Sequence, residues 1–112
     1  MIGEIVRAGI YFADFLEAGD KRVLVVSWNA INHGLRSPIV CLIASNPRTR
    51  TLPTDVFIPA GEAGMDEDSW ILCHEIATLG AEDFRREIGT VPSTLLVEVE
   101  AALRRALDLP QA

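Results

Sequence analysis

The chain has 112 residues, of which 49% are hydrophobic, so it fits a single domain over residues 1–112 that can fold without disulfides or metal ions. Its net charge of −6 argues against a general nucleic-acid binder, because phosphate groups are bound by cations. The sequence has no signal-peptide pattern and no run of roughly 18 apolar residues, so we expect a cytoplasmic protein that does not enter a membrane.

The charge is unevenly distributed along the chain. Residues 1–58 hold six Lys and Arg against five acidic residues, whereas residues 59–112 hold four Arg against eleven acidic residues. Because contacts with a polyanion need cations, we expect such contacts in the first half of the chain.

Short segments rich in β-branched and aromatic residues predict strands. The second of them contains the run 23–26, Val-Leu-Val-Val, which is so apolar that both faces of this strand are expected to be buried. Gly, Asp, Asn and Pro separate the segments and indicate turns. The predicted strands are residues 5–15, 21–28, 37–45, 56–58, 70–76 and 88–91.

Three segments predict helices. Asn residues and a terminal Gly indicate one helical turn over 28–34, and an acidic first turn indicates a short helix over 81–87. From Ser93 onward, apolar residues recur at three- and four-residue steps, which predicts an amphipathic helix of about four turns that Pro110 ends. The fold class is therefore α+β: a small, strongly curved, mainly antiparallel sheet with a C-terminal helix.

The cysteine and histidine residues give no metal-binding pattern. Cys41 and Cys73 each lie within an apolar run and are expected to be small core residues. Together with His33 and His74, they show none of the close spacings of zinc ligands. We therefore predict no structural metal and no cofactor.

Polar side chains interrupt the buried strands at their ends. They are Arg22, Ser45 with Asn46, and His74 with Glu75. The ends of neighbouring strands converge in a tightly curved sheet, so these groups could line one groove. A guanidinium, a hydroxyl, an imidazole and a carboxylate would suffice to cleave a phosphodiester without a metal. Each group also has an ordinary alternative, as a solvated strand edge, a turn residue or a surface side chain.

Several segments follow one another in a characteristic order: residues 7–14, 21–27 followed by Asn29 and Asn32, 52–54, 68–69, 75–79, 88–89 and 106–109. Taken in this order, they resemble the MazF/PemK family of toxins from bacterial type II toxin-antitoxin systems. The resemblance implies an SH3-like barrel, of the kind shared by CcdB and MazF, with a long C-terminal helix, in a homodimer. It also implies metal-independent cleavage of single-stranded mRNA at short sequences, which leaves a cyclic phosphate and a 5′-hydroxyl, and inhibition by a cognate antitoxin.

The resemblance also implies roles for individual residues. The family arginine that begins the second strand corresponds to Arg22, which we expect to stabilise the transition state or donate a proton. Ser45 and His74 are expected to be its catalytic partners, His74 because a histidine near neutral pKa can act as acid or base. The residues expected to contact RNA are Lys21, Asn46, Arg48, Arg50 and Glu75.

The chain departs from the family's pattern at several positions. It has Arg-Ala-Gly at 7–9 where the family usually has Arg-Gly-Asp or Arg-Gly-Glu, Val23 where proline follows the catalytic arginine, and a short loop at 15–20. An ungapped match also puts Ala44 where the family commonly has a catalytic Thr or Ser. Because neighbouring residues of a strand point to opposite faces, Ser45 can supply the missing hydroxyl only if the strand end is bulged or shifted in register.

Two other functions remain open at this point. Ala44 and the acidic net charge favour a non-enzymatic module, either a degenerate toxin that still binds an antitoxin or a CcdB-like poison of DNA gyrase. The chain could also be a structural protein that shares only the fold, since a fold does not dictate a function.

Overall fold

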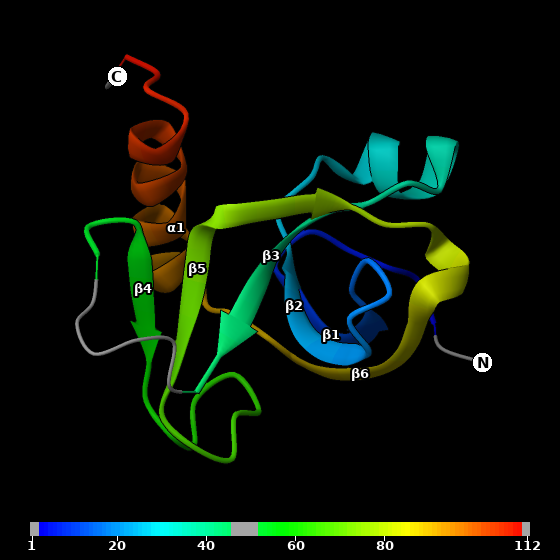
Figure 1. The fold of residues 1–112 in the computed structure, drawn as a ribbon, viewed down its shortest axis with the longest axis horizontal. Helices are drawn as coiled ribbons and strands as arrows, with labels where there is room; N and C mark the ends of the chain where they lie inside the picture. The colour runs from blue at the N-terminus through cyan, green and yellow to red at the C-terminus, as the bar shows by residue number, and fades with distance from the viewer. Residues whose placement is uncertain (1–2, 46–51, 111–112) are drawn as a thin grey trace.

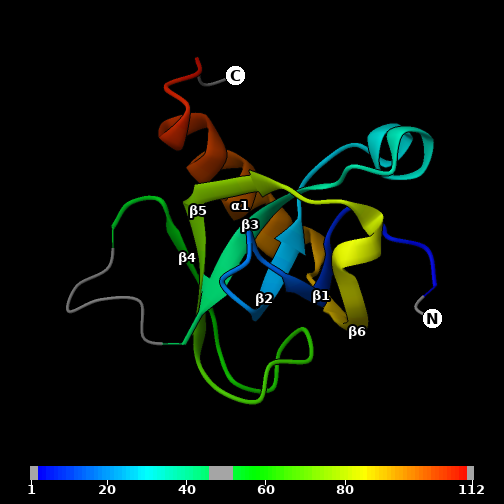
Figure 2. The ribbon, with the colours of Figure 1, turned by 45° about the vertical axis from the view of Figure 1, so that its right-hand side comes forward.

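The computed structural model describes residues 3–45 and 52–110, which form one six-stranded antiparallel sheet and a C-terminal helix (Figure 1). The strands lie in the order β4-β5-β3-β2-β1-β6. Helix α1, Ser93–Ala106, packs against β4 and β5 (Figure 2). The strands are β1 (Gly9–Asp14), β2 (Asp20–Val25), β3 (Ile39–Ala44), β4 (Asp55–Ile58), β5 (Ser69–Thr78) and β6 (Phe84–Thr90).

This architecture confirms the predicted fold class, with a curved, antiparallel sheet and a C-terminal helix. In the part of the chain that the structure describes, β4 and β6 remain the two edges of the sheet. The sheet is therefore strongly bent but does not close into a barrel.

A register shift in β5 produces the bend. Cys41 of β3 lies opposite Ile76, and the next residue, Leu42, lies opposite Leu72, so one step on β3 corresponds to four on β5. The extra residues, 73–75, form a bulge, which increases the local twist of a sheet. Figure 1 shows β5 turning sharply between its two halves. One long strand thereby belongs to two differently oriented parts of the sheet.

Apolar side chains bury both faces of the sheet, as predicted for the second strand. Along β2, Leu24 lies in the core that α1 covers, and Val23 and Val25 lie in the core on the other face. The α1-side core comprises Ile10, Leu24, Cys41, Ile43, Val56, Ile58, Met65, Ile71, Cys73, Val91, Leu95, Val99 and Ala102. The opposite core comprises Ile5, Tyr11, Ala13, Phe15, Val23, Val25, Val40, Ala77, Leu79 and Phe84.

The two cysteines are free and buried in the α1-side core, which confirms their predicted role. A hydrogen bond with Cys73 and burial both raise the pKa of the Cys41 thiol. A thiol is a nucleophile only as the thiolate, so a raised pKa makes Cys41 unreactive.

The C-terminal helix and the predicted helical turn are both present. Helix α1 buries Leu95, Val99 and Ala102, the residues that the three- and four-residue spacing selects, and Arg104 and Arg105 in its last turn suit the helix dipole. The helical turn is a π-helix at Ile31–Leu35. Among the described residues, no helix is long and apolar enough to cross a bilayer.

The predicted helix over 81–87 is wrong beyond its first turn. Ala81–Asp83 form a 3-10 helix, but β6 begins at Phe84 and continues to Thr90. Phe84 is buried and its ring meets that of Tyr11 edge-on, with centroids 5.3 Å apart. Pairing with β1 and this aromatic contact therefore outweigh the local helical signal.

Candidate active site

Arg22 lies in β2 with its side chain on the α1 side of the sheet. Its backbone pairs with Ile43 of β3, which belongs to the α1-side core, and paired residues share a face. The Nη1 group donates to Ser69 Oγ at 2.8 Å and to Met65 Sδ at 3.3 Å. Arg22 is half-buried, so these contacts hold its guanidinium in place and exclude the alternative of a solvated strand edge.

Ser69 is the hydroxyl residue in contact with Arg22. It is fully buried at the start of β5, and its Oγ donates to the carbonyl oxygen of Glu67 at 2.9 Å. Ser69 belongs to one of the segments that carry the family resemblance, but the sequence assigned it no role in the site. Ala44 at the end of β3 pairs with Trp70 of β5, so Ser69 lies opposite the position that follows Ala44. This strand register is not visible in the sequence.

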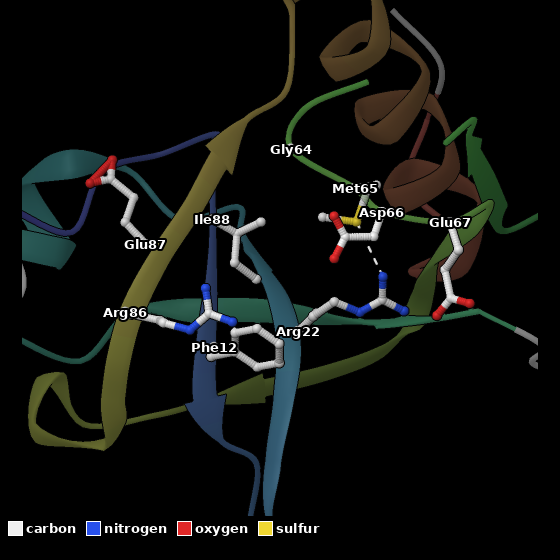
Figure 3. Close-up of a pocket in the computed structure, with 9 residues that line it drawn as sticks. All are labelled: Phe12, Arg22, Gly64, Met65, Asp66, Glu67, Arg86, Glu87 and Ile88. Carbon is white, nitrogen blue, oxygen red and sulfur yellow. Dashed lines mark hydrogen bonds between the residues drawn. The ribbon is translucent and has the colours of Figure 1, made fainter. Parts of the chain in front are cut away.

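A cavity of about 300 Å³ lies beside Arg22 (Figure 3). Strands β1, β2 and β6 supply one part of its lining, and the loop before β5 supplies the other. The carboxylates of Asp66 and Glu67 lie on either side of the Arg22 guanidinium in Figure 3. The lining residues are Phe12, Arg22, Gly64, Met65, Asp66, Glu67, Arg86, Glu87 and Ile88.

Glycine residues let the loop before β5 lie directly on the backbone of β6. Gly64 has φ of +82°, and a Cβ atom on it would lie 2.5 Å from the carbonyl oxygen of Ile88. A Cβ atom on Gly89 would collide with the carbonyl oxygen of Ala63. One wall of the cavity is therefore fixed by contact between two backbones.

Ser45 and Ala44 lie at the end of β3. Ala44 follows Ile43, so strand alternation places it on the face opposite to Arg22, where it pairs with Trp70. Ser45 is half-buried and comes directly after the strand. Neither residue lines the Arg22 cavity.

His74 lies at the bulge of β5, away from the Arg22 cavity. Its Nδ1 is 3.1 Å from Thr54 Oγ1 and 3.9 Å from Asp55 Oδ1, and its Nε2 is 3.9 Å from Glu75 Oε2. None of these partners lines the cavity, and neither does His74. The structure therefore does not bring His74 and Arg22 together in one groove.

Two of the residues expected to contact RNA lie in the part of the chain that the structure describes, and neither lines the Arg22 cavity. Lys21 pairs with Ala13, which belongs to the opposite core, so Lys21 is exposed on the face away from Arg22. Glu75 is exposed at the bulge of β5. The predicted contacts Asn46, Arg48 and Arg50 lie outside the described residues.

Phe12 and Arg86 are among the cavity residues to which the sequence assigned no role. Phe12 of β1 pairs with Arg86 of β6, and the Cζ atom of Arg86 lies 4.3 Å from the centroid of the Phe12 ring. In the sequence, Arg86 stands out only as part of the Arg-Arg pair at 85–86. This pair lies in the acidic half of the chain and in the segment predicted as a helix.

Similarity to known proteins identifies the family of the chain. Residues 6–107 match the model of the family described as the PemK-like, MazF-like toxin of type II toxin-antitoxin systems. The chain therefore belongs to this family of toxins. Over 112 residues it is 36% identical to the endoribonuclease MazF6 of Mycobacterium tuberculosis, with 94% of this chain and 98% of that protein covered.

Two further proteins extend the comparison. The chain is 29% identical over 109 residues to the endoribonuclease EndoA of Bacillus subtilis, with 92% of this chain and 94% of that protein covered. A solved structure of an endoribonuclease from a mycobacterial species, in complex with its cognate antitoxin, superposes with a TM-score of 0.83 at 26% identity. That superposition covers 96% of this chain and 99% of the other.

Proposed function

We propose that this chain is the toxin of a type II toxin-antitoxin system and acts as a metal-independent endoribonuclease on single-stranded mRNA. Membership of the family and similarity to proteins named endoribonucleases support this function. The observation that carries the proposal is the guanidinium of Arg22, which Ser69 and Met65 hold beside a cavity. A fixed guanidinium is suited to phosphate because its planar donors match the phosphate oxygens.

The chemistry is an attack by the RNA on its own backbone. The 2′-hydroxyl oxygen forms a bond to phosphorus while the bond from phosphorus to the 5′ oxygen breaks. A base accepts the 2′ proton and an acid donates a proton to the leaving 5′ oxygen, which leaves a cyclic phosphate and a 5′-hydroxyl. Arg22 stabilises the negative charge that accumulates on the phosphorane. Ser69 and Met65 both contact Nη1, so Nη2 and Nε are the donors assigned to the phosphate.

The carboxylates that share the cavity with Arg22 are candidates for proton transfer. Asp66 and Glu67 line this cavity, and in the view of Figure 3 their carboxylates appear on either side of the guanidinium. Ser45 and His74, which the sequence suggested, lie outside this lining, and their roles stay predictions. We prefer Asp66 and Glu67 to Ser45 and His74 because a general base must come within hydrogen-bond reach of the proton that it removes.

RNA cleavage in EDTA tests the proposed function. Wild-type protein is incubated with a long single-stranded RNA, and primer extension locates the cuts. We expect cleavage at a short recurring sequence and a loss of at least a hundredfold in kcat for Arg22→Ala, the scale of losing one transition-state donor. No cleavage of any RNA by the wild type, or equal rates for the wild type and the variant, would overturn the proposal.

The two alternative functions have less support. The two relatives described above, MazF6 and EndoA, are named endoribonucleases. The described contacts of Arg22 give no support to an action on DNA gyrase. A DNA supercoiling assay with the same preparation separates gyrase poisoning from RNA cleavage. A protein that binds an antitoxin but cuts no RNA would be the degenerate module.

We also propose that the chain forms a homodimer and binds a cognate antitoxin. A similar endoribonuclease has been solved with its cognate antitoxin. Large exposed apolar side chains support further contacts, since such groups often mark interaction surfaces. They include Trp28 before the π-helix, Leu35 at its end, and Val97, Leu107 and Leu109 on or after α1. Sedimentation equilibrium of the purified protein measures the dimer, and a monomer at micromolar concentration would contradict it.

A further inference from the structure

Phe12 lies between two arginine residues in one row across three strands. It pairs with Arg22 of β2 on one side and with Arg86 of β6 on the other. Directly paired residues share a face, so all three side chains lie on the α1 side of the sheet, and all three line the cavity (Figure 3). The two arginines are separated by two strand spacings, about 10 Å between their Cα atoms.

The Phe12 ring orients the guanidinium of Arg86. The Cζ atom lies 4.3 Å from the ring centroid, which is the geometry of a cation-π contact. A guanidinium that stacks on a ring through its flat face keeps its N–H donors at the edge, where they can bind a phosphate. The contact therefore fixes a cation without using its hydrogen-bond donors.

The neighbouring Arg85 is engaged differently. Its Nε lies 3.4 Å from Asp20 Oδ1, and its Nη1 donates to the carbonyl oxygen of Glu82 at 3.3 Å. Arg85 does not line the Arg22 cavity. Within the described residues, Arg86 forms no such ion pair, and its contact is the ring of Phe12. The two adjacent arginines thus differ in partners and in location.

We propose that Arg86 binds the RNA phosphate next to the one that is cleaved. This inference rests on the proposed ribonuclease function and adds a substrate-binding residue to it. Arg22 contacts the scissile phosphate, and Arg86 contacts a neighbouring one across the ring of Phe12. Asp66, Glu67 and Glu87 are exposed carboxylates in the same lining, and water and salt screen exposed charges.

A phosphate contact away from the scissile bond has a recognisable kinetic effect. It contributes to substrate binding before and during the reaction, so its loss raises KM and leaves kcat nearly unchanged. It also releases about one condensed counterion on binding, and for single-stranded nucleic acid each such contact contributes about 0.7 to the slope of log affinity against log salt. Loss of Arg86 is expected to weaken binding by about tenfold for RNA of any sequence.

The experiment compares Arg86→Ala, Arg86→Lys and the matched control Arg85→Ala with the wild type. KM and kcat are measured on an RNA with one cleavage site. Affinity is measured by fluorescence anisotropy at several salt concentrations, on the same RNA with a 2′-deoxy sugar at the cut. We expect Arg86→Ala to raise KM about tenfold and to reduce the salt slope by about 0.7. Arg86→Lys should restore the slope, and Arg85→Ala should match the wild type.

The outcomes separate this inference from the proposed function. If the wild type cleaves RNA and Arg86→Ala keeps the wild-type KM and salt slope, the role of Arg86 is wrong and the ribonuclease function stands. Equal losses for Arg85→Ala and Arg86→Ala would also overturn it, because they would reflect general charge attraction. If the wild type binds the 2′-deoxy RNA but cuts no RNA, the proposed function fails while the binding data still decide the role of Arg86. If it binds no RNA, both fail.

Discussion

Arg22 and Ser69 form a hydrogen bond of 2.8 Å that joins β2 to the first residue of β5, 47 positions later in the chain. Ser69 is fully buried, and its hydroxyl donates a hydrogen bond to the carbonyl oxygen of Glu67. This buried hydroxyl thus orients the guanidinium without itself lining the cavity. Ser69 is therefore a positioning residue in the proposed reaction.

Ser69→Ala should reduce catalysis more than RNA binding. The substitution leaves the Arg22 donor and the Glu67 carbonyl without this partner, at a cost of about 1–3 kcal/mol. We expect kcat to fall by about ten- to a hundredfold, with binding of a 2′-deoxy RNA close to that of the wild type. Ser45→Ala is the matched control, and a larger loss of kcat in that variant would assign the catalytic hydroxyl to Ser45.

His74→Ala should leave most of the activity intact. His74 lies with Thr54 and Asp55 at the bulge of β5 and does not line the Arg22 cavity. We expect kcat within about threefold of the wild type and an unchanged pH profile between pH 5 and 8, where histidine usually titrates. A lost limb of the pH-rate profile would show instead that His74 transfers a proton, as the sequence suggested.

Gly64→Ala should destabilise the protein more than Gly61→Ala. Both residues have positive φ, +82° and +91°, so alanine is strained at either position by about 1 kcal/mol. A Cβ atom at position 64 also meets the Ile88 carbonyl oxygen, whereas no heavy atom lies within 4 Å of one at position 61. We expect a loss of about 3 kcal/mol against about 1 kcal/mol in urea unfolding. Equal losses would mean that the loop and β6 separate easily.

Ala8→Gly should stabilise the fold. Ala8 has φ of +75°, in the left-handed region that favours glycine. We expect the free energy of unfolding to rise by about 0.5–1 kcal/mol, with an increase of a few degrees in Tm. Ala30→Gly is the control, since Ala30 has φ of −62° and the same substitution there should lower stability. A destabilised Ala8→Gly variant would contradict the expectation.

Tyr11→Phe should change the alkaline stability of the protein. The Tyr11 hydroxyl accepts from the Val6 N–H at 3.0 Å and donates to the Glu4 carbonyl oxygen at 3.2 Å. Burial raises the pKa of Tyr11 above its ordinary value of 10.0. The folded state therefore holds this proton more tightly than the unfolded state, and the resulting stability is present below pH 10 and is lost as the pH rises through the folded pKa.

Two observations check this prediction. At pH 7, the variant should lose about 1 kcal/mol with the two hydrogen bonds. Above pH 10, its free energy of unfolding should fall less steeply than that of the wild type, because the buried phenol no longer titrates. Parallel curves in alkaline solution would show that Tyr11 does not contribute to the pH dependence.

The sequence predicted the parts of the fold that local patterns determine. The apolar run 23–26 predicted a strand buried on both faces, and the spacing after Ser93 predicted α1. The segment 81–87 was misjudged because its partner, β1, lies more than 70 positions earlier in the chain. Its pairing with β1, at Tyr11 with Glu87, Phe12 with Arg86 and Ala13 with Phe84, makes it a strand.

The candidate site was predictable in part for the same reason. Arg22 was identified because its position before a buried run is visible in the sequence. Its contacts with Ser69 and Met65 depend on strand register and on a loop that closes over the strand, and neither is encoded by spacing along the chain. Ser45 and His74 were singled out as polar strand ends, but the bulge at 73–75 takes His74 away from Arg22.

The contact between Gly64 and β6 divides the cavity into a part that can change and a part that cannot. Where backbone lies on backbone, at Gly64 and Gly89, any side chain would force the wall apart. Met65, Asp66 and Glu67 follow directly and contribute side chains to the same wall. An engineer who wishes to redirect the enzyme to another RNA sequence would therefore keep the two glycines, Met65 and the candidate proton-transfer residues Asp66 and Glu67. The exposed Glu87, which also lines the cavity, is the position to vary, because a new side chain there alters the cavity without moving its frame.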